Sequence, residues 1–192
     1  QRERVARLEL NAALDNTFVP TPGANAHVTA HSLAPDGSIL IGGLFTAYNG
    51  TGRKRLALIR GTRRVAVKVL LDGPYTGSTM TDALRTLPSF PLTEPYTAVG
   101  YRHPTFIPGN TILPGVLTVT GNDAIVDWVL VEMRPWASPG TIAAARAVLL
   151  QRDGDVVDLD GRSTIGFAGL VDGSYCVAVR HRNHLPVMLS SS

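Results

Sequence analysis

The sequence holds 192 residues, of which 44% are hydrophobic and 17% are charged, a balance that supports a folded core and excludes a disordered chain. Its net charge of +3 comes without the aromatic-studded basic face of a nucleic-acid binder, and no apolar run is long enough to span a membrane. The single cysteine, Cys176, excludes an intramolecular disulfide, and its alternating surroundings predict a buried position in a strand.

Short apolar runs separated by 19 glycines and 13 prolines predict an all-β fold of short strands joined by tight turns. Residues 5–10, VARLEL, alternate between apolar and polar side chains as a strand does. Residues 28–33 form a second strand, and the tight turn Pro35-Asp36-Gly37 returns the chain through Ser38 to Ile41. The N-terminal part therefore contains an antiparallel hairpin.

Glycines mark the elements that follow this hairpin. Gly42 and Gly43 are expected to break the strand that passes through Ile41. A loop containing Asn49-Gly50 comes next, and Arg55 to Ile59 supply another strand. The sequence thus predicts a unit of three or four short strands.

The N-terminal unit resembles the delta-60 repeat, a β-propeller blade unit of secreted bacterial proteins, over about residues 5–60. That repeat combines a leucine-aspartate-phenylalanine turn, a proline-aspartate-glycine turn, an isoleucine-glycine-glycine strand end and an asparagine-glycine loop before an arginine-leucine-alanine strand. The matching residues are, in order, Leu14, Asp15, Phe18, Pro35, Asp36, Gly37, Ile41, Gly42, Gly43, Phe45, Asn49, Gly50, Arg55, Leu56 and Ala57.

A single blade is a physical problem, because three or four strands leave an exposed edge on each side and two faces that need cover. Three arrangements could provide that cover: the rest of this chain, other subunits, or a propeller of which this is the last blade. We expect the edge of residues 5–10 to accept a neighbouring strand. Its residues are Val5, Arg7, Leu8 and Leu10.

From Val65 onward, apolar runs recur at the spacing of a β-sandwich after a polar, proline-punctuated connection at residues 76–96. TIAAARAVLLQ could also be a short helix because of its alanines, but Asp153-Gly154 follows it as a two-residue hairpin turn and favours a strand. The predicted strands are VAVKVLLDGPY with its Gly-Pro turn, VLTVTG, AIVDWVLVEM, TIAAARAVLLQ, DVVDLDG and SYCVAVRH.

This second part is similar to a β-sandwich module near the C-terminus of large surface proteins exported by the type IX secretion route. The similarity spans residues 65–188 and rests on LLDGPYTG, LTEPYTAVGY, AIVDWVLVEMR, LLQRDGDVVDLDG and VAVRHRNHLPVM. It implies an extracellular location at the bacterial cell surface. We therefore predict two domains, a single blade-like repeat at residues 1–62 and an Ig-like or jelly-roll β-sandwich at residues 63–192.

Four carboxylates within QRDGDVVDLDG form the strongest charged cluster of the sequence. Calcium binds several oxygen ligands close together, so one loop could hold this cofactor. The spacing is not that of an EF-hand, and the alternative is a hairpin turn followed by an outward-facing acidic strand. The candidate ligands are Asp153, Asp155, Asp158 and Asp160.

Carbohydrate binding is the alternative function, because sugars stack on exposed aromatic rings. Trp136 follows Arg134-Pro135 in a predicted loop, and Tyr96 and Tyr101 lie in or beside loops. These three side chains are the candidate sugar platform. Trp128, in the middle of an apolar strand, is expected in the core.

The basic segment Arg180 to His184 is the counterpart of the acidic residues. His181 and His184, three apart in a strand, are expected on opposite faces, so a shared zinc ion is not predicted. Arg180 and Arg182 are expected to form salt bridges with the acidic strand or with Glu132.

Catalytic motifs are missing from the sequence: it has neither a glycine-x-serine-x-glycine elbow nor a phosphate-binding loop, and Asp127 and Glu132 fall on opposite sides of one strand. The sequence thus predicts a non-enzymatic module that acts in adhesion or assembly outside the cell. Its blade edges would be completed by a neighbouring subunit or by another domain of the parent protein, building a filament or array. Surface glycans are the alternative partner.

Overall fold

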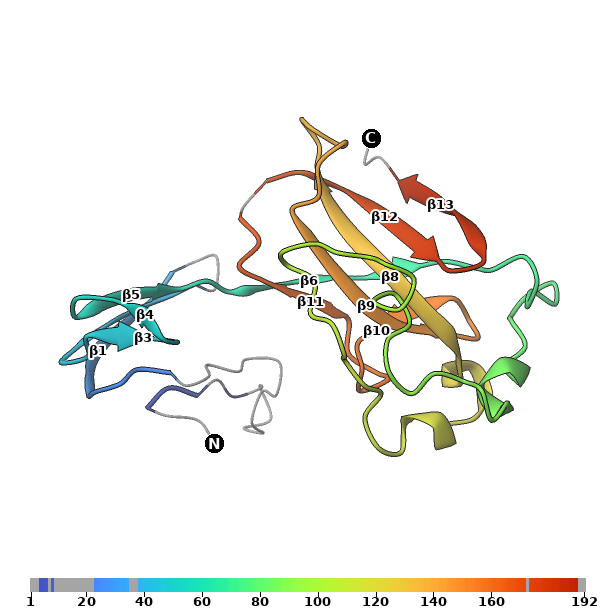
Figure 1. The fold of residues 1–192 in the computed structure, drawn as a ribbon, viewed down its shortest axis with the longest axis horizontal. Helices are drawn as coiled ribbons and strands as arrows, with labels where there is room; N and C mark the ends of the chain where they lie inside the picture. The colour runs from blue at the N-terminus through green and yellow to red at the C-terminus, as the bar shows by residue number, and fades with distance from the viewer. Residues whose placement is uncertain (1–3, 7, 9–22, 35–37, 172, 190–192) are drawn as a thin grey trace. The chain divides into compact units, whose positions relative to one another are not determined.

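The computed structural model of the chain describes residues 4–6, 8, 23–34, 38–171 and 173–189, and within them it is all-β, as predicted. In chain order, the strands are β1 (Val28–Leu33), β2 (Ile39–Gly43), β3 (Ala47–Tyr48), β4 (Thr51–Gly52), β5 (Leu56–Ile59), β6 (Thr62–Val65), β7 (Val67–Lys68), β8 (Ile125–Pro135), β9 (Ala144–Gln151), β10 (Asp155–Val157), β11 (Ile165–Ala168), β12 (Tyr175–His181) and β13 (His184–Leu189). Three short 3-10 helices, η1 (Ala83–Thr86), η2 (Val116–Thr118) and η3 (Gly121–Asp123), complete the elements of the described residues (Figure 1).

The chain divides into two compact units. The first comprises Gln1–Arg63 with Ala168–Asp172, and the second comprises Arg64–Phe167 with Gly173–Ser192. The predicted domains, 1–62 and 63–192, are continuous in sequence, whereas the first unit also takes in a short segment from the C-terminal half. Strand β6, where this division falls, pairs with β11 in a two-stranded sheet.

The first unit contains a three-stranded antiparallel sheet in the order β1-β2-β5 and a small hairpin of β3 and β4. The turn of this small hairpin is Asn49-Gly50, where both residues have positive φ, 48° and 73°, as a two-residue hairpin turn of the right twist requires. The Asn49 side chain also accepts a hydrogen bond from the backbone N–H of Gly23 at 2.9 Å. The predicted turn function of Asn49-Gly50 is confirmed.

The predicted end of the strand at Gly42 and Gly43 is observed at the second glycine, because β2 includes both residues and ends at Gly43. The reason for glycine at position 43 is close packing. A Cβ atom there would lie 2.1 Å from the carbonyl oxygen of His27 and 2.9 Å from the Cα atom of Val28. Gly43, the last residue of β2, thus lets the backbone at His27 approach the strand.

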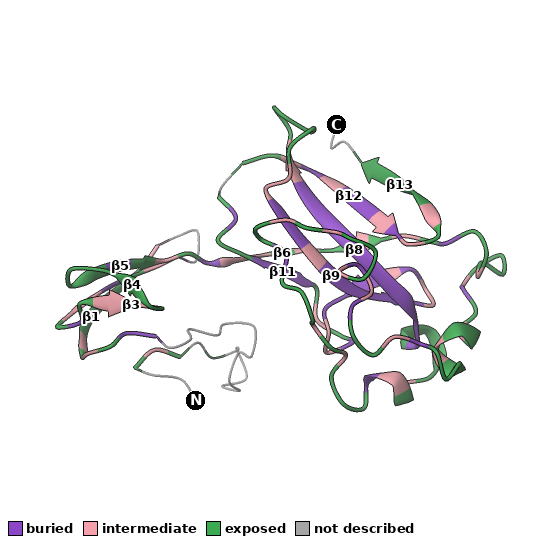
Figure 2. Cartoon of the chain, viewed as in Figure 1, coloured by how far each residue is buried: buried purple, intermediate pink, exposed green. Residues whose placement is uncertain are grey.

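The second unit is built on a six-stranded sheet in the order β13-β12-β8-β9-β10-β7, and its assigned pairs are antiparallel (Figure 1). β8 is buried along both faces from Ile125 to Met133, and most of β9 is buried too (Figure 2). This explains why AIVDWVLVEM reads as a nearly continuous apolar run, and why TIAAARAVLLQ forms a strand and not a helix.

One face of this sheet is covered by the long connection between β7 and β8. Phe90, Tyr96, Phe106 and Val116 of the connection pack against Trp128 and other residues of β8 and β9. The layer on this face is therefore irregular chain, and the two-sheet sandwich stays a prediction.

Within the connection between β7 and β8, the predicted strand VLTVTG is wrong. Its first three residues form η2 and its last residue, Gly121, begins η3; Gly115, with a left-handed φ of 84°, precedes η2, and Val116 is buried in the core.

Other predictions for single residues hold in this unit. Trp128 is fully buried, and its indole N–H donates to the carbonyl oxygen of Pro91 at 2.8 Å. Cys176 is buried in β12. In the part of the chain that the structure describes, no helix combines the length and the apolar character required to cross a lipid bilayer.

Candidate functional site

The predicted assembly edge at residues 5–10 lies only partly within the described residues. Arg7 and Leu10 fall outside them. Val5 is partly buried and packs against the apolar cluster of the first unit, which consists of Ala24, Ile41, Phe45 and Ala57. Leu8 is exposed. Val5 therefore contributes to the core of the blade and is not free on an outer edge.

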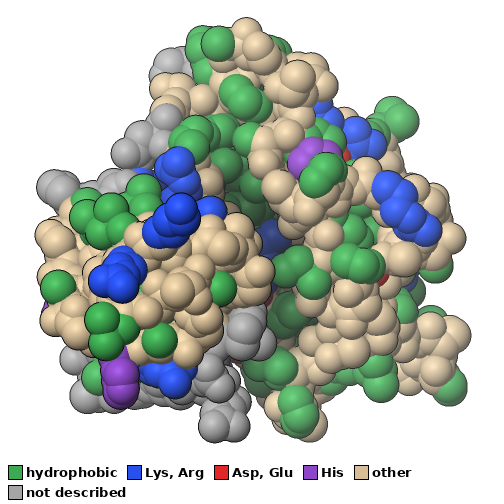
Figure 3. Space-filling model, turned by 60° about the vertical axis from the view of Figure 1, so that its left-hand side comes forward, with side chains coloured by type: hydrophobic (Ala, Val, Ile, Leu, Met, Phe, Trp, Pro, Cys, Tyr) green, Lys and Arg blue, Asp and Glu red, His purple; other side chains and the backbone are tan. Residues whose placement is uncertain are grey.

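The opposite face of the β1-β2-β5 sheet carries exposed leucines. Leu40 in β2 and Leu58 in β5 are direct cross-strand partners, and Leu56 lies two residues along β5 on the same side. Their exposed fractions are 40%, 54% and 57%, whereas Ile41 and Ala57, which alternate with them, are buried. We call Leu40, Leu56 and Leu58 the open leucine face. In the view of Figure 3, hydrophobic side chains lie at the surface next to Lys and Arg side chains.

The four aspartates proposed for calcium do not come together. Among the described residues, no group of three or more His, Cys, Asp or Glu side chains is placed to hold a metal ion. Nζ of Lys68 lies 3.9 Å from Oδ2 of Asp153 and 3.2 Å from Oδ1 of Asp155. Asp158 forms a two-pronged ion pair with Arg146, at 2.7 Å for both contacts. Partners inside the protein thus occupy these carboxylates, and the calcium prediction is not supported.

Asp160 closes the turn that follows β10. Its Oδ1 accepts the backbone N–H groups of Arg162 and Ser163, at 3.0 and 2.9 Å, and its Oδ2 accepts the Ser163 hydroxyl at 2.6 Å. Burial alone would raise the pKa of Asp160, but these hydrogen bonds outweigh it and hold the pKa below its usual value.

The lowered pKa of Asp160 predicts a pH-dependent contribution to stability. A carboxylate whose pKa is lower in the folded state stabilises the fold above the unfolded-state pKa, and this contribution is lost as the pH falls through the folded-state pKa. We expect Asp160→Asn to be less stable than the wild type at pH 6, with the difference shrinking below about pH 4. Urea unfolding at pH 6 and pH 3 measures it. An equal difference at both pH values would contradict the assignment.

Only one of the three aromatic residues proposed for sugar binding is broadly exposed. Tyr96 is buried, and its hydroxyl contacts the carbonyl oxygens of Trp128 and Arg180 at 3.0 and 3.2 Å, so it cannot stack on a sugar in solution. Tyr101 is half-buried against Phe106 in a T-shaped pair. Trp136 is 49% exposed just beyond β8.

Tyr101 lines a cavity of about 430 Å³, formed with Thr97, Arg102, His103, Pro104, Phe106 and Pro108. The Tyr101 hydroxyl points away from solvent and donates to Oε1 of Glu132 at 3.0 Å. Burial and this hydrogen bond raise the pKa of Tyr101 above its ordinary value. The phenol is therefore a neutral donor to a buried carboxylate at any physiological pH.

Glu132 is the centre of a buried ion cluster. Its side chain is completely buried in the middle of the sheet. Arg134 donates to Oε2 through Nε at 2.9 Å and through Nη2 at 2.7 Å, and Nε of Arg180 lies 3.0 Å from Oε1. The predicted salt bridge between Arg180 and Glu132 is confirmed. Two arginines and the Tyr101 hydroxyl thus compensate the desolvation of one carboxylate.

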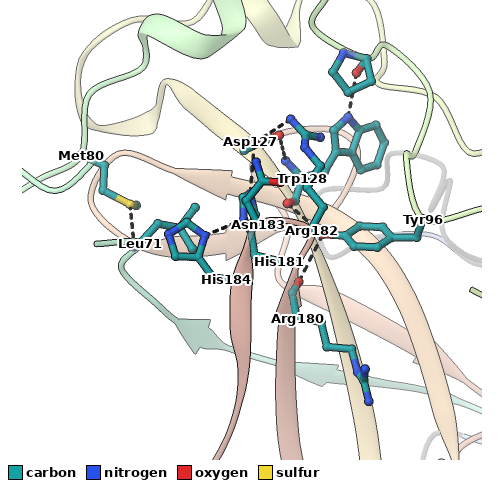
Figure 4. A network of polar contacts seen from close by, with 11 residues as sticks. Leu71, Met80, Tyr96, Asp127, Trp128, Arg180, His181, Arg182, Asn183 and His184 are labelled. Atoms are coloured by element: carbon teal, nitrogen blue, oxygen red, sulfur yellow. Dashed lines mark hydrogen bonds and ion pairs between the residues drawn. The ribbon is translucent and has the colours of Figure 1, made fainter. Parts of the chain in front are cut away.

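A second buried carboxylate, Asp127, lies on the other face of β8, as predicted, because it is five residues from Glu132 in the regular part of the strand. Figure 4 shows the residues around Asp127. Its Oδ2 accepts from Nη2 of Arg182 at 2.9 Å and lies 3.1 Å from Nε2 of His181. The backbone N–H of Asn183 donates to Nδ1 of His181, which assigns the ring proton of a neutral His181 to Nε2. His181 therefore donates to Asp127.

The predicted separation of His181 and His184 onto opposite faces is wrong. Arg182-Asn183 is the turn of the hairpin that joins β12 to β13, so the two histidines are cross-strand partners. Their ring centroids are 4.7 Å apart, and their Nδ1 atoms are 2.7 Å apart. Sequence spacing suggested a continuous strand, and Asn183 was the one residue that could have indicated the turn.

Groups inside the protein compensate the charge of each buried carboxylate. Glu132 and Asp127 each have arginine partners, and neither carboxylate faces the other across a cavity. Their evident role is to fix the position of β12 against β8 and of the connection against the sheet. That the protein is not an enzyme stays a prediction from the sequence.

Of three comparisons with known proteins, the one with family models supports a propeller-like blade in the first unit. No curated protein and no solved structure is detectably similar to the chain. One family model, described as a β-propeller domain of unknown function (DUF5122), matches residues 34–60, which contain β2 to β5. The first unit therefore includes a stretch similar to a β-propeller repeat, and its three-stranded sheet is a propeller-like blade.

Proposed function

We propose that this chain is a non-enzymatic module of the bacterial cell surface that acts in adhesion or assembly, with its blade completed by a neighbouring subunit or by another domain of its parent protein. The observation that carries the proposal is the open leucine face of the blade. The extracellular location rests on the resemblance of residues 65–188 to modules of type IX-exported proteins.

The open leucine face is apolar, as is typical of a surface that packs against a neighbouring layer. Leu40 and Leu58 stand opposite each other at the centre of the blade, and Leu56 extends the patch. A repeat unit of this kind does not bury its apolar faces alone, and stacking on a neighbour supplies the missing cover. A second blade-like sheet fits this face because its own side chains alternate with the same period.

Concentration-dependent assembly tests the proposal. We expect light scattering after size-exclusion chromatography to show a mass that rises with the concentration of the wild-type chain. Leu58→Glu places a charge on the open leucine face and should lower the mass below that of the wild type at the same concentration. Val99→Glu is the control, because Val99 is similarly exposed, at 66%, but lies in a turn of the second unit.

A stable monomer at every concentration, with slow amide hydrogen exchange throughout β2 and β5, would contradict the proposal. Such a monomer would show that the blade needs no neighbour.

Carbohydrate binding is the second candidate, and the half-exposed ring of Trp136 favours it. We expect a glycan array to detect binding by the wild-type chain and a loss of signal with Trp136→Ala. Tyr96→Phe is the control, since the Tyr96 ring is buried and does not reach solvent. An unchanged signal with Trp136→Ala would exclude this ring as the sugar platform.

A further inference from the structure

A second exposed apolar surface lies in the second unit, at the β13 end of the six-stranded sheet. β13 pairs with β12 on one side, and among the described residues no strand lies on its other side (Figure 1). The five residues Leu185 to Leu189 are all exposed (Figure 2). Four of them are large hydrophobic residues with exposed fractions of 49–89%: Leu185, Val187, Met188 and Leu189.

Two other outer strands of the main sheets, β7 and β1, have features that oppose edge-to-edge pairing. β7, at the far end of the same sheet, is only two residues long, and its Lys68 is paired with Asp155. The outer strand of the blade, β1, carries the polar residues Thr29, His31 and Ser32. β13 has no such charge, since every side chain from Leu185 to Leu189 is uncharged and apolar.

Pro186 does not close this edge. The register of β13 against β12 shifts between the pair of His181 with His184 and the pair of Val179 with Val187, so Pro186 lies in the irregular part of the ladder. Proline is tolerated at such positions. The regular part, Val187 to Leu189, stays in register with β12 and presents its outer backbone groups to solvent.

We infer that β13 is a homotypic assembly edge, which pairs antiparallel with β13 of a second copy of this chain. Two observations favour a second copy as the occupant. The assigned strand pairs of this sheet are all antiparallel, so a two-fold related β13 continues the same pattern. An uncharged strand also meets itself without like-charge contacts, which would otherwise oppose self-pairing.

This inference concerns the second unit and does not depend on the proposed function of the blade. With a blade contact on one unit and a two-fold contact on the other, one chain would carry two distinct interfaces. An isologous contact alone gives a closed dimer, and a second contact of a different type extends dimers into a larger assembly.

Charge complementation tests the inference on the full chain. We expect Val187→Lys and Val187→Glu, each alone, to weaken dimerisation at least about tenfold in sedimentation equilibrium, because each variant sets like charges close together across the two-fold pair. A one-to-one mixture of the two variants should restore dimerisation, since opposite charges then meet. Amide hydrogen exchange in β8 and β9 confirms that each variant is folded.

Leu58→Lys is the matched control, because it adds the same charge to an exposed position on the blade and should leave the β13 dimer intact. Failure of the mixture to dimerise would overturn the inference. The inference would also be overturned if each single Val187 variant dimerised as strongly as the wild type, or if the wild-type chain formed no dimer at all. Loss of assembly in Leu58→Lys alone would assign the contact to the blade and overturn the β13 pairing.

Discussion

Glu132→Gln is expected to lower the free energy of unfolding by about 3–5 kcal/mol, the range for removing one partner of a buried ion pair. The carboxylate is fully buried and receives Arg134 at one oxygen and Tyr101 with Arg180 at the other. An amide in its place turns an NH2 group toward one set of donors. Arg134, whose side chain is 13% exposed, then keeps a largely buried charge without a counter-ion. Urea unfolding followed by tryptophan fluorescence measures the loss.

Asp155→Asn is the matched control for this prediction. It makes the same chemical change in a carboxylate that pairs with Lys68 at 3.2 Å, but both side chains are at least half exposed. Exposed ion pairs contribute little, so we expect a loss below about 1 kcal/mol. If the two variants lose equal stability, the stabilising role that we assign to the Glu132 cluster is wrong.

The sequence predicted the parts of the fold that depend on local patterns. Asn49-Gly50 forms a hairpin turn because its two positive φ angles suit asparagine and glycine. The apolar run around Trp128 is a central strand, because a strand covered on both faces needs no alternation. The turn at Asp153-Gly154 likewise identified β9 as a strand despite its alanines, since a hairpin turn follows it.

Features that depend on contacts between distant residues could not be read in this way. The aspartates after β9 resemble a cation loop in sequence, but Arg146 and Lys68 approach them in the fold and take the carboxylates. VLTVTG has strand composition, yet it begins with the 3-10 turn η2, which follows Gly115 and buries Val116. Tertiary packing decides these segments, and local propensity is only a weak guide to them.

The assembly surfaces show the same division between pattern and contact. A lone blade needs a neighbour because of its small number of strands, and the open leucine face agrees with this expectation. The exposed residues differ from the predicted assembly edge, because Val5 packs into the blade core while Leu40, Leu56 and Leu58 stay exposed. β13 was not expected at all, since the turn at Arg182-Asn183 has neither glycine nor proline to mark it.

Gly43→Ala is expected to destabilise the blade by about 3 kcal/mol, the upper end of the range for overpacking. The new methyl group would lie 2.1 Å from the carbonyl oxygen of His27 and 2.9 Å from the Cα atom of Val28. Both obstacles are backbone atoms, so no side chain can rotate away. The hydrogen bond from the Leu44 N–H to the His27 carbonyl, 2.8 Å long, would have to open. Amide hydrogen exchange in β1, β2 and β5 should become about a hundredfold faster.

Gly42→Ala distinguishes this steric effect from the general consequences of replacing a strand glycine. The nearest atom to a Cβ at Gly42 is the carbonyl oxygen of Arg55, at an ordinary contact distance of 3.8 Å. Neither glycine has a positive φ, so both substitutions keep an accessible backbone conformation. We therefore expect exchange in Gly42→Ala to stay within a few-fold of the wild type. Equal acceleration in both variants would mean that strand flexibility, and not the contact with His27, explains the glycine at position 43.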